Sequence, residues 1–137
     1  MPAKDHLQGE QLRMFIPAHE LLRMPSRDVF SEDYNYYDAL KHGTPLSLRD
    51  DDEVHYQKLE EAERSGLHSS IRKHGVQAPV HLAYVYPNMW DSPFMGGIPT
   101  GKKILFLQDG NHRVSAAHDI DENMEIPVEY FEDDTYL

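Results

Sequence analysis

Five consecutive residues, Asp109-Gly110-Asn111-His112-Arg113, carry side chains of the types that bind phosphate groups. They follow a short apolar run and precede a segment with helical spacing, so the sequence predicts a strand, a turn and the start of a helix. Unpaired N–H groups and the helix dipole favour anions at such a helix start. Gly110 would let the backbone approach a phosphate closely, and Asn111 would cap the helix and offer its amide. His112 and Arg113 would donate hydrogen bonds, and the guanidinium can hold two phosphate oxygens at once.

Asp109 carries the opposite charge and would repel a bare phosphate. Its carboxylate could instead hold a Mg²⁺ ion that bridges to a phosphate, or orient Arg113. Asp109 is therefore a candidate metal ligand, for Mg²⁺ that arrives with a nucleoside triphosphate. The same residues also permit a simpler interpretation, because Asp-Gly is a common turn and Arg113 can pair with any nearby carboxylate.

Apolar spacing on either side of this turn indicates the elements that must position it. Ile104-Leu105-Phe106-Leu107 is a continuous apolar run, which suits a strand buried on both faces. Helical spacing extends from Asp50 to His74, with Gly75 as its stop and Gly66 as a break that would divide it into two helices. Further strands are expected at 12–16, 79–86 and 126–131, a short helix at 18–22 and another helix from Asn111. We therefore predict an α/β (α+β) fold, a small mixed sheet flanked by helices.

The length of the chain predicts a single domain. At 137 residues it can enclose one hydrophobic core and is too short for two. We expect residues 1–11 to be a flexible N-terminus and residues 12–131 to form the domain. Residues 30–49 and 87–103 are predicted to be an insertion and a long loop within it. Residues 132–137 are expected to be an acidic, solvated tail.

Charge and composition disfavour several classes of function. The net charge of -11, from 24 acidic residues against 13 Lys and Arg residues, opposes stable DNA binding by this chain alone. The nearest approach to a basic patch, Arg72-Lys73-His74, is interpreted as the last turn of a helix. The absence of cysteine excludes disulfides, thiolate zinc sites and sulfur nucleophiles. No apolar run approaches the roughly 20 residues of a membrane span and residues 1–11 have no targeting core, so we expect a cytoplasmic protein without a membrane partner.

Nine histidines raise the question of a metal site. His68 and His74 lie six residues apart, as do His112 and His118, and this spacing places each pair on different faces of a helix. The sequence contains no zinc-ligand spacing. We therefore predict surface or capping roles for the histidines.

Four segments occur in the order found in the ParB/sulfiredoxin superfamily. Residues 67–80 resemble the family's helix that ends at a glycine and is followed by a strand that begins with a proline. Residues 104–117 resemble its next strand, its Gly-x-x-Arg turn and the start of its Ala-rich helix. Residues 125–131 resemble the following strand, and residues 12–27 are similar, more loosely, to the first strand and an arginine-bearing loop. The insertion and the long loop lie outside the resemblance.

The superfamily includes partition proteins that bind and hydrolyse CTP, sulfiredoxins that use ATP, free-serine kinases and nucleases. By position, the resemblance implies phosphate contacts from Gly110 and Arg113, with Asn111 and His112 beside them. Sulfiredoxin chemistry is disfavoured because it needs a cysteine at this turn. Partition activity is disfavoured because the chain stops at Leu137, before any DNA-reading region, and because Asn111 stands where partition proteins commonly have glutamate.

The Asp-Gly-Asn-His-Arg variant is similar to the kinase-like and the phage or mobile-element members. A kinase-like enzyme, nucleotide hydrolase or nuclease would require Mg²⁺ and a further acid as general base or metal ligand. Glu20 and Asp28 are the candidates for this catalytic acid in the other matched segment, beside Asp109. Whether any reaction is catalysed stays open.

Three hypotheses follow. The first is a ParB-like domain that binds a nucleotide or another phosphorylated ligand with Mg²⁺, as an accessory protein of a phage or mobile element. The second is a non-enzymatic module that binds a host or partner protein through its acidic surface or its Tyr-rich insertion, which contains Tyr34, Tyr36 and Tyr37. The third is a ParB-like nuclease.

Overall fold

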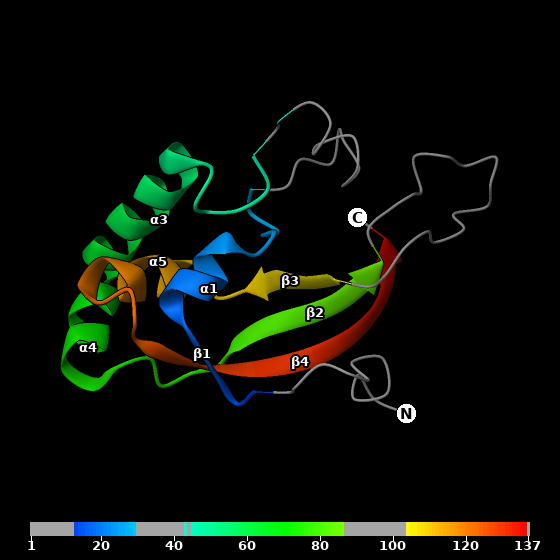
Figure 1. The fold of residues 1–137 in the computed structure, drawn as a ribbon. Helices are drawn as coiled ribbons and strands as arrows, with labels where there is room; N and C mark the ends of the chain where they lie inside the picture. The colour runs from blue at the N-terminus through cyan, green and yellow to red at the C-terminus, as the bar shows by residue number, and fades with distance from the viewer. Residues whose placement is uncertain (1–12, 30–42, 44, 87–103, 137) are drawn as a thin grey trace.

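The computed structural model describes residues 13–29, 43, 45–86 and 104–136 (Figure 1). The predicted flexible N-terminus, the predicted long loop and the three tyrosines of the predicted insertion lie outside these residues. The elements are β1 (Phe15–Pro17), α1 (Ala18–Arg23), α3 (Asp52–Ser65), α4 (Leu67–His74), β2 (Val80–Tyr86), β3 (Ile104–Asp109), α5 (Asn111–Ile120) and β4 (Glu125–Tyr136).

The four strands form one mixed sheet in the order β1-β4-β2-β3. β2 runs parallel to β4, with Val80 opposite Val128, and antiparallel to β3. β1 pairs antiparallel with β4 on the other side, where Ile16 lies opposite Ile126. With helices packed against this sheet around a single core, the predicted fold class is confirmed.

β4 is longer than the sequence predicts. It continues through the segment expected to be a solvated tail, as far as Tyr136. Its backbone stays paired with β2 there, with Glu132 opposite Tyr84 and Tyr136 opposite Tyr86. The prediction of an acidic tail is therefore wrong over residues 132–136, because the ladder to a neighbouring strand outweighs the poor strand propensity of acidic residues.

The predicted break at Gly66 is confirmed. The carboxylate of Asp51 caps α3 by accepting a hydrogen bond from the Val54 N–H at 3.0 Å. Gly66 then takes the left-handed conformation, with φ of 84°, ends α3 and starts α4 at an angle to it. α4 ends at Gly75, and Arg72-Lys73-His74 form its exposed last turn, as predicted.

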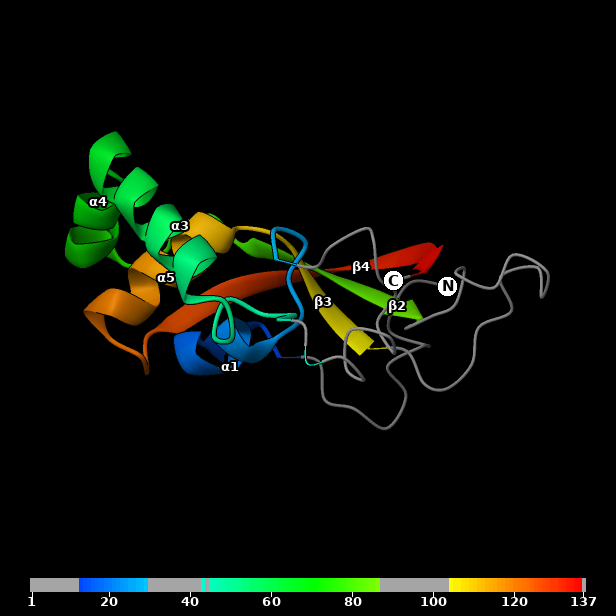
Figure 2. The same cartoon turned by 90° about the horizontal axis from the view of Figure 1, so that it is seen from above.

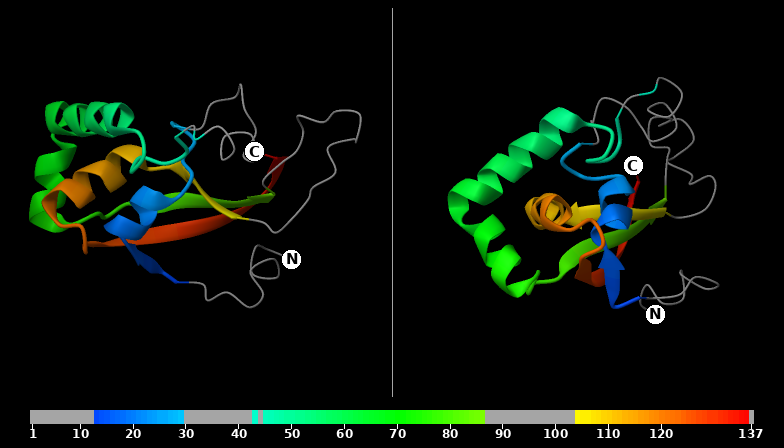
Figure 3. Two further views of the ribbon diagram at one scale, coloured as in Figure 1. Left: turned by 45° about the horizontal axis from the view of Figure 1, so that its top comes forward. Right: turned by 60° about the vertical axis from the view of Figure 1, so that its left-hand side comes forward.

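α5 lies at the centre of the helical layer. It packs against α3, α4, α1 and the sheet strand β2. Figure 2 shows α3, α4 and α5 gathered at one end of the sheet, and the right-hand view in Figure 3 shows α5 enclosed between α1 and the α3–α4 pair. The fully buried side chains of this core include Ile16, Leu21, Leu82, Leu107, Val114 and Ile126.

The end of the predicted insertion belongs to this core. Leu48 is fully buried, and Ser47 forms an isolated bridge with Pro25. The last residues of the predicted insertion thus pack into the domain before α3 begins. Among the described residues, no helix is long and apolar enough to cross a membrane.

Candidate functional site

The predicted strand, turn and helix start are present. β3 ends at Asp109, Gly110 has a φ of 105°, and α5 begins at Asn111. A Cβ atom at position 110 would stand 2.5 Å from Cγ1 of Val80 and 2.8 Å from its Cβ. Glycine is therefore required by the backbone conformation and by close packing against β2, in addition to any role beside a ligand.

Asn111 does not cap the helix as predicted. The N-cap position belongs to Gly110, and no side chain makes a capping hydrogen bond there. The Asn111 side chain instead turns inward, is only 3% exposed and accepts a hydrogen bond from the Ser26 hydroxyl. Its role is to tie the turn to the loop that follows α1, because a buried amide must find a partner.

The loop after α1 runs beside β3. The Leu107 N–H donates to Pro25 O at 2.8 Å and the Arg27 N–H donates to Leu107 O at 3.0 Å. Asp28 follows directly, and its carboxylate pairs with Lys58 of α3 at 2.9 Å. Together with the Ser26–Asn111 bond, this ladder brings the predicted acid Asp28 and the exposed side chain of Arg27 to the same end of β3 as the turn.

Arg113 is partly engaged by the protein itself. Its Nη1 donates to Ala78 O at 2.9 Å and to Pro79 O at 2.7 Å, just before β2 begins. Its Nη2 lies 3.9 Å from the Asp109 carboxylate, too far for a hydrogen bond. A guanidinium has five N–H donors, and within the described part of the chain Nε and Nη2 of Arg113 make no hydrogen bond, so this edge can bind two oxygens of one anion.

The charged side chains around the turn include almost as many cations as carboxylates. His112 lies 3.5 Å from the Glu61 carboxylate of α3, and Asp109 lies 3.8 Å from His81 of β2. Asp109 is the most open of these groups, with 64% of its side chain exposed. Among the described residues, the cations Arg27, Lys58 and Arg113 stand beside the anions Asp28, Glu61, Asp109 and Glu129, which lies 3.7 Å from His81. The carboxylates therefore exceed the cations by one here, which is a small part of the net charge of -11.

Glu20, the other candidate acid, is not brought to the turn by any contact of the described residues. Its carboxylate accepts two hydrogen bonds from Arg13, at 2.7 and 3.2 Å, beside β1. The hydrogen bond from Arg13 holds the pKa of Glu20 below its ordinary value, against a smaller opposing effect of burial. Glu20 is thus a partner in a half-exposed ion pair and has no geometric tie to Asp109.

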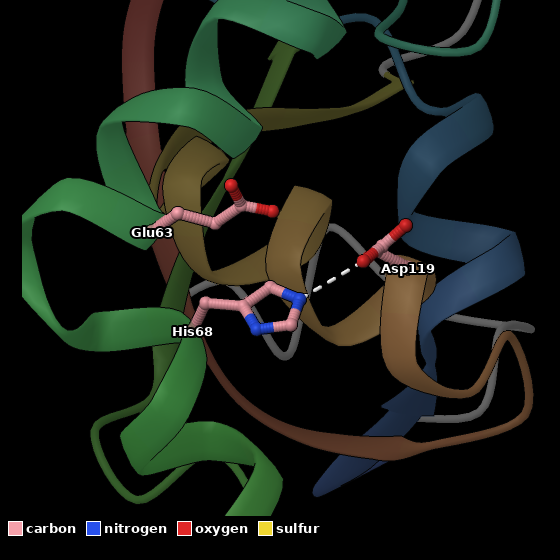
Figure 4. Close-up of side chains that lie close together, drawn as sticks. All are labelled: Glu63, His68 and Asp119. Carbon is pink, nitrogen blue, oxygen red and sulfur yellow. Dashed lines mark hydrogen bonds and ion pairs between the residues drawn. The ribbon is translucent and has the colours of Figure 1, made fainter.

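Sequence reasoning missed a second group of polar side chains. Glu63, His68 and Asp119 come together from three helices, and His68 is only 8% exposed (Figure 4). The prediction of a surface or capping role is therefore wrong for His68. Asp119 is 51 residues from His68, so only the tertiary fold unites them. Ser26, Lys58 and Glu61 at the turn were missed for the same reason.

Comparisons with known proteins leave the chain without an assigned family. No protein-family model matches it, and neither does any curated protein or solved structure.

Proposed function

We propose that the chain is a ParB-like domain that binds a nucleotide or another phosphorylated ligand, with Mg²⁺, at the β3–α5 turn. One observation carries the proposal. A strand ends at an exposed carboxylate, a left-handed glycine follows, and the helix that starts next carries Arg113, whose Nη2 lies 3.9 Å from that carboxylate.

The start of α5 supplies donors for a phosphate. Its first helical hydrogen bond runs from the Val114 N–H to Gly110 O at 3.0 Å. The N–H groups of Asn111, His112 and Arg113 precede it and have no partner within the helix. These N–H groups can donate to phosphate oxygens, as can Nε and Nη2 of Arg113. The positive end of the helix dipole adds electrostatic attraction for the anion.

Asp109 suits the proposed Mg²⁺ ion. Mg²⁺ is commonly held by one or two carboxylates together with phosphate oxygens and water. Asp109 lies directly before the β3–α5 turn, and one carboxylate supplies too few oxygen atoms to hold Mg²⁺ alone. We therefore expect Mg²⁺ to bind there only together with a phosphorylated ligand. The ion would also cancel the repulsion between Asp109 and the phosphate.

Asp28 is the better candidate for an acid or base in any reaction at this site. Both carboxylates lie in ion pairs, Asp28 with Lys58 and Glu20 with Arg13, but only the loop of Asp28 is tied to the turn, through Ser26 and Asn111. We propose ligand binding as the function, with Asp28 as the group to test for turnover of the bound ligand.

One observation favours the alternative, a non-enzymatic module that binds a partner protein. Two carbonyl oxygens already accept hydrogen bonds from Nη1 of Arg113, so this arginine stabilises the fold whether or not a ligand is bound. The nuclease hypothesis ranks below both, because the net charge of -11 opposes the approach of DNA.

The thermal midpoint tests the proposal. We expect Mg²⁺ with one of ATP, CTP, GTP or ADP to raise Tm by about 10 °C when the ligand is near 100 times its Kd. Arg113→Ala should lose this rise, and Arg72→Ala, an exposed arginine on α4, should keep it. The shift on adding ligand is compared within each variant, because Arg113→Ala also removes the bonds to Ala78 and Pro79. No shift with any nucleotide would favour the partner-binding module.

A further inference from the structure

Glu63, His68 and Asp119 form a cluster that the proposed phosphate site does not use. Glu63 lies on the last turn of α3, His68 on the first turn of α4 and Asp119 on the last turn of α5. One ligand atom from each residue lies within 4.8 Å of those of the other two. Figure 4 shows the Glu63 carboxylate and the His68 ring directed toward the same space as Asp119.

We propose that these three side chains bind a divalent transition-metal ion, for which Zn²⁺ is the appropriate probe. One imidazole nitrogen and two carboxylate oxygens are ligands that Zn²⁺ accepts, usually three from the protein with water in the remaining position. Mg²⁺ and Ca²⁺ prefer sites made of oxygen alone, so the histidine selects against them.

The bend at Gly66 creates the site. Side chains five residues apart in one continuous helix point about 140° away from each other. Gly66, with φ of 84°, ends α3 and redirects the chain, so that Glu63 and His68 face a common point from two helices. α5 packs against both helices and adds Asp119.

Burial and charge fit a bound cation. His68 is 8% exposed, whereas Glu63 and Asp119 are exposed, so the imidazole is held in place while the opposite side stays open for water ligands. Nε2 of His68 lies 2.9 Å from an oxygen of Asp119, close to the separation of two ligands on one metal ion. Zn²⁺ would replace the proton that these two atoms share.

The Glu63–His68–Asp119 cluster is separate from the β3–α5 turn. Asp119 lies six residues after Arg113, which is about 9 Å further along the axis of α5. The turn uses the N-terminal end of this helix and the cluster uses its C-terminal end. Loss of one site therefore does not require loss of the other.

Equilibrium dialysis of the full chain against Zn²⁺, with the bound metal measured by mass spectrometry, tests the proposal. We expect one ion per chain at a site that excess Mg²⁺ does not displace. His68→Gln and Glu63→Gln should each weaken binding by at least about tenfold, since outer-shell partners alone contribute that much. His74→Gln and Glu60→Gln, two exposed positions on the same helices, should leave the affinity unchanged.

A second measurement covers the case in which His68→Gln fails to fold. Zn²⁺ should raise the Tm of the native chain, because the three ligands are assembled only in the folded state. Glu63→Gln changes an exposed side chain with little effect on packing, and it should reduce the rise at the same Zn²⁺ concentration. Stoichiometric binding that survives both substitutions, or no stoichiometric binding by the native chain, would overturn the proposal.

Discussion

At the scale of single residues, Gly110 is fixed by two constraints that act together. Its φ of 105° lies where side chains are rarely tolerated, and Val80 fills the space that a Cβ atom would need. The glycine between β3 and α5 therefore sets how closely the turn packs on β2. It also sets the position of the helix start that would receive a phosphate.

Replacing Gly110 with alanine should destabilise the fold by about 2–5 kcal/mol, the sum of the left-handed backbone cost and of overpacking against Val80. Gly66→Ala is the matched control, because its φ is also positive but nothing lies within 4 Å of its Cβ position. The control should lose only about 1–2 kcal/mol. Urea unfolding measures both values, and equal losses would show that contact with Val80 is unimportant.

The types and order of the turn residues were predictable from the sequence, but their partners were not. Asn111 follows an Asp-Gly pair, a pattern that indicates a helix cap, yet its amide binds Ser26, 85 residues away. The guanidinium of Arg113 was expected to face a ligand, and one of its nitrogens instead binds backbone carbonyls before β2. Such partners depend on tertiary packing, which local spacing does not contain.

At the scale of elements, α3 and α5 meet through a half-buried histidine contact. Nδ1 of His55 lies 2.8 Å from the hydroxyl oxygen of Ser115, which is fully buried. Burial lowers the pKa of His55 below its ordinary value of 6.5, with a smaller contribution from neighbouring His118, while Asp119 and Asp52 oppose the shift. The folded chain therefore favours the neutral ring.

This depressed pKa predicts a pH dependence of stability. Below pH 6.5 the unfolded chain binds a proton on His55 that the folded chain does not yet accept, so stability is lost as pH falls through the folded pKa. His55→Asn keeps a hydrogen-bonding group near Ser115 and removes the titration. The urea midpoint should therefore fall less for this variant than for the native chain between pH 7.5 and 5.0. Parallel falls would contradict a depressed pKa.

Strongly periodic elements were predictable, and their ends were less so. The break at Gly66 and the stop at Gly75 were confirmed because glycine controls them locally. The extension of β4 to Tyr136 was missed because its charged residues do not alternate with apolar ones. Pairing with β2 maintains that part of the strand, and this pairing comes from another part of the chain.

At the scale of the whole molecule, the distribution of charge decides which anionic ligands can approach the β3–α5 turn. The net charge of -11 opposes nucleic acid over most of the surface. At the β3–α5 turn, cations from the loop after α1, from α3 and from α5 offset most of the nearby carboxylates. The proposed ligand, a small phosphorylated molecule with its own Mg²⁺, would meet little net charge at this site, whereas a long polyanion would meet the acidic surroundings.

α5 connects the two proposed sites through the core. Its N-terminal end belongs to the phosphate turn, and Asp119 near its C-terminal end belongs to the cluster with Glu63 and His68. The buried middle of the helix, from Val114 to Ala117, fixes both ends relative to the sheet.

The most direct test of the phosphate site is a ¹H–¹⁵N NMR titration of the full chain with Mg²⁺ and each of ATP, CTP, GTP and ADP. We expect at least one nucleotide to move the backbone amide signals of residues 110–114 most, with those of residues 26–28 next and little change at 119–123. Arg113→Ala should remove these shifts. If no nucleotide moves the amides of the turn, or if the shifts cluster elsewhere, the chain does not bind phosphate at this site.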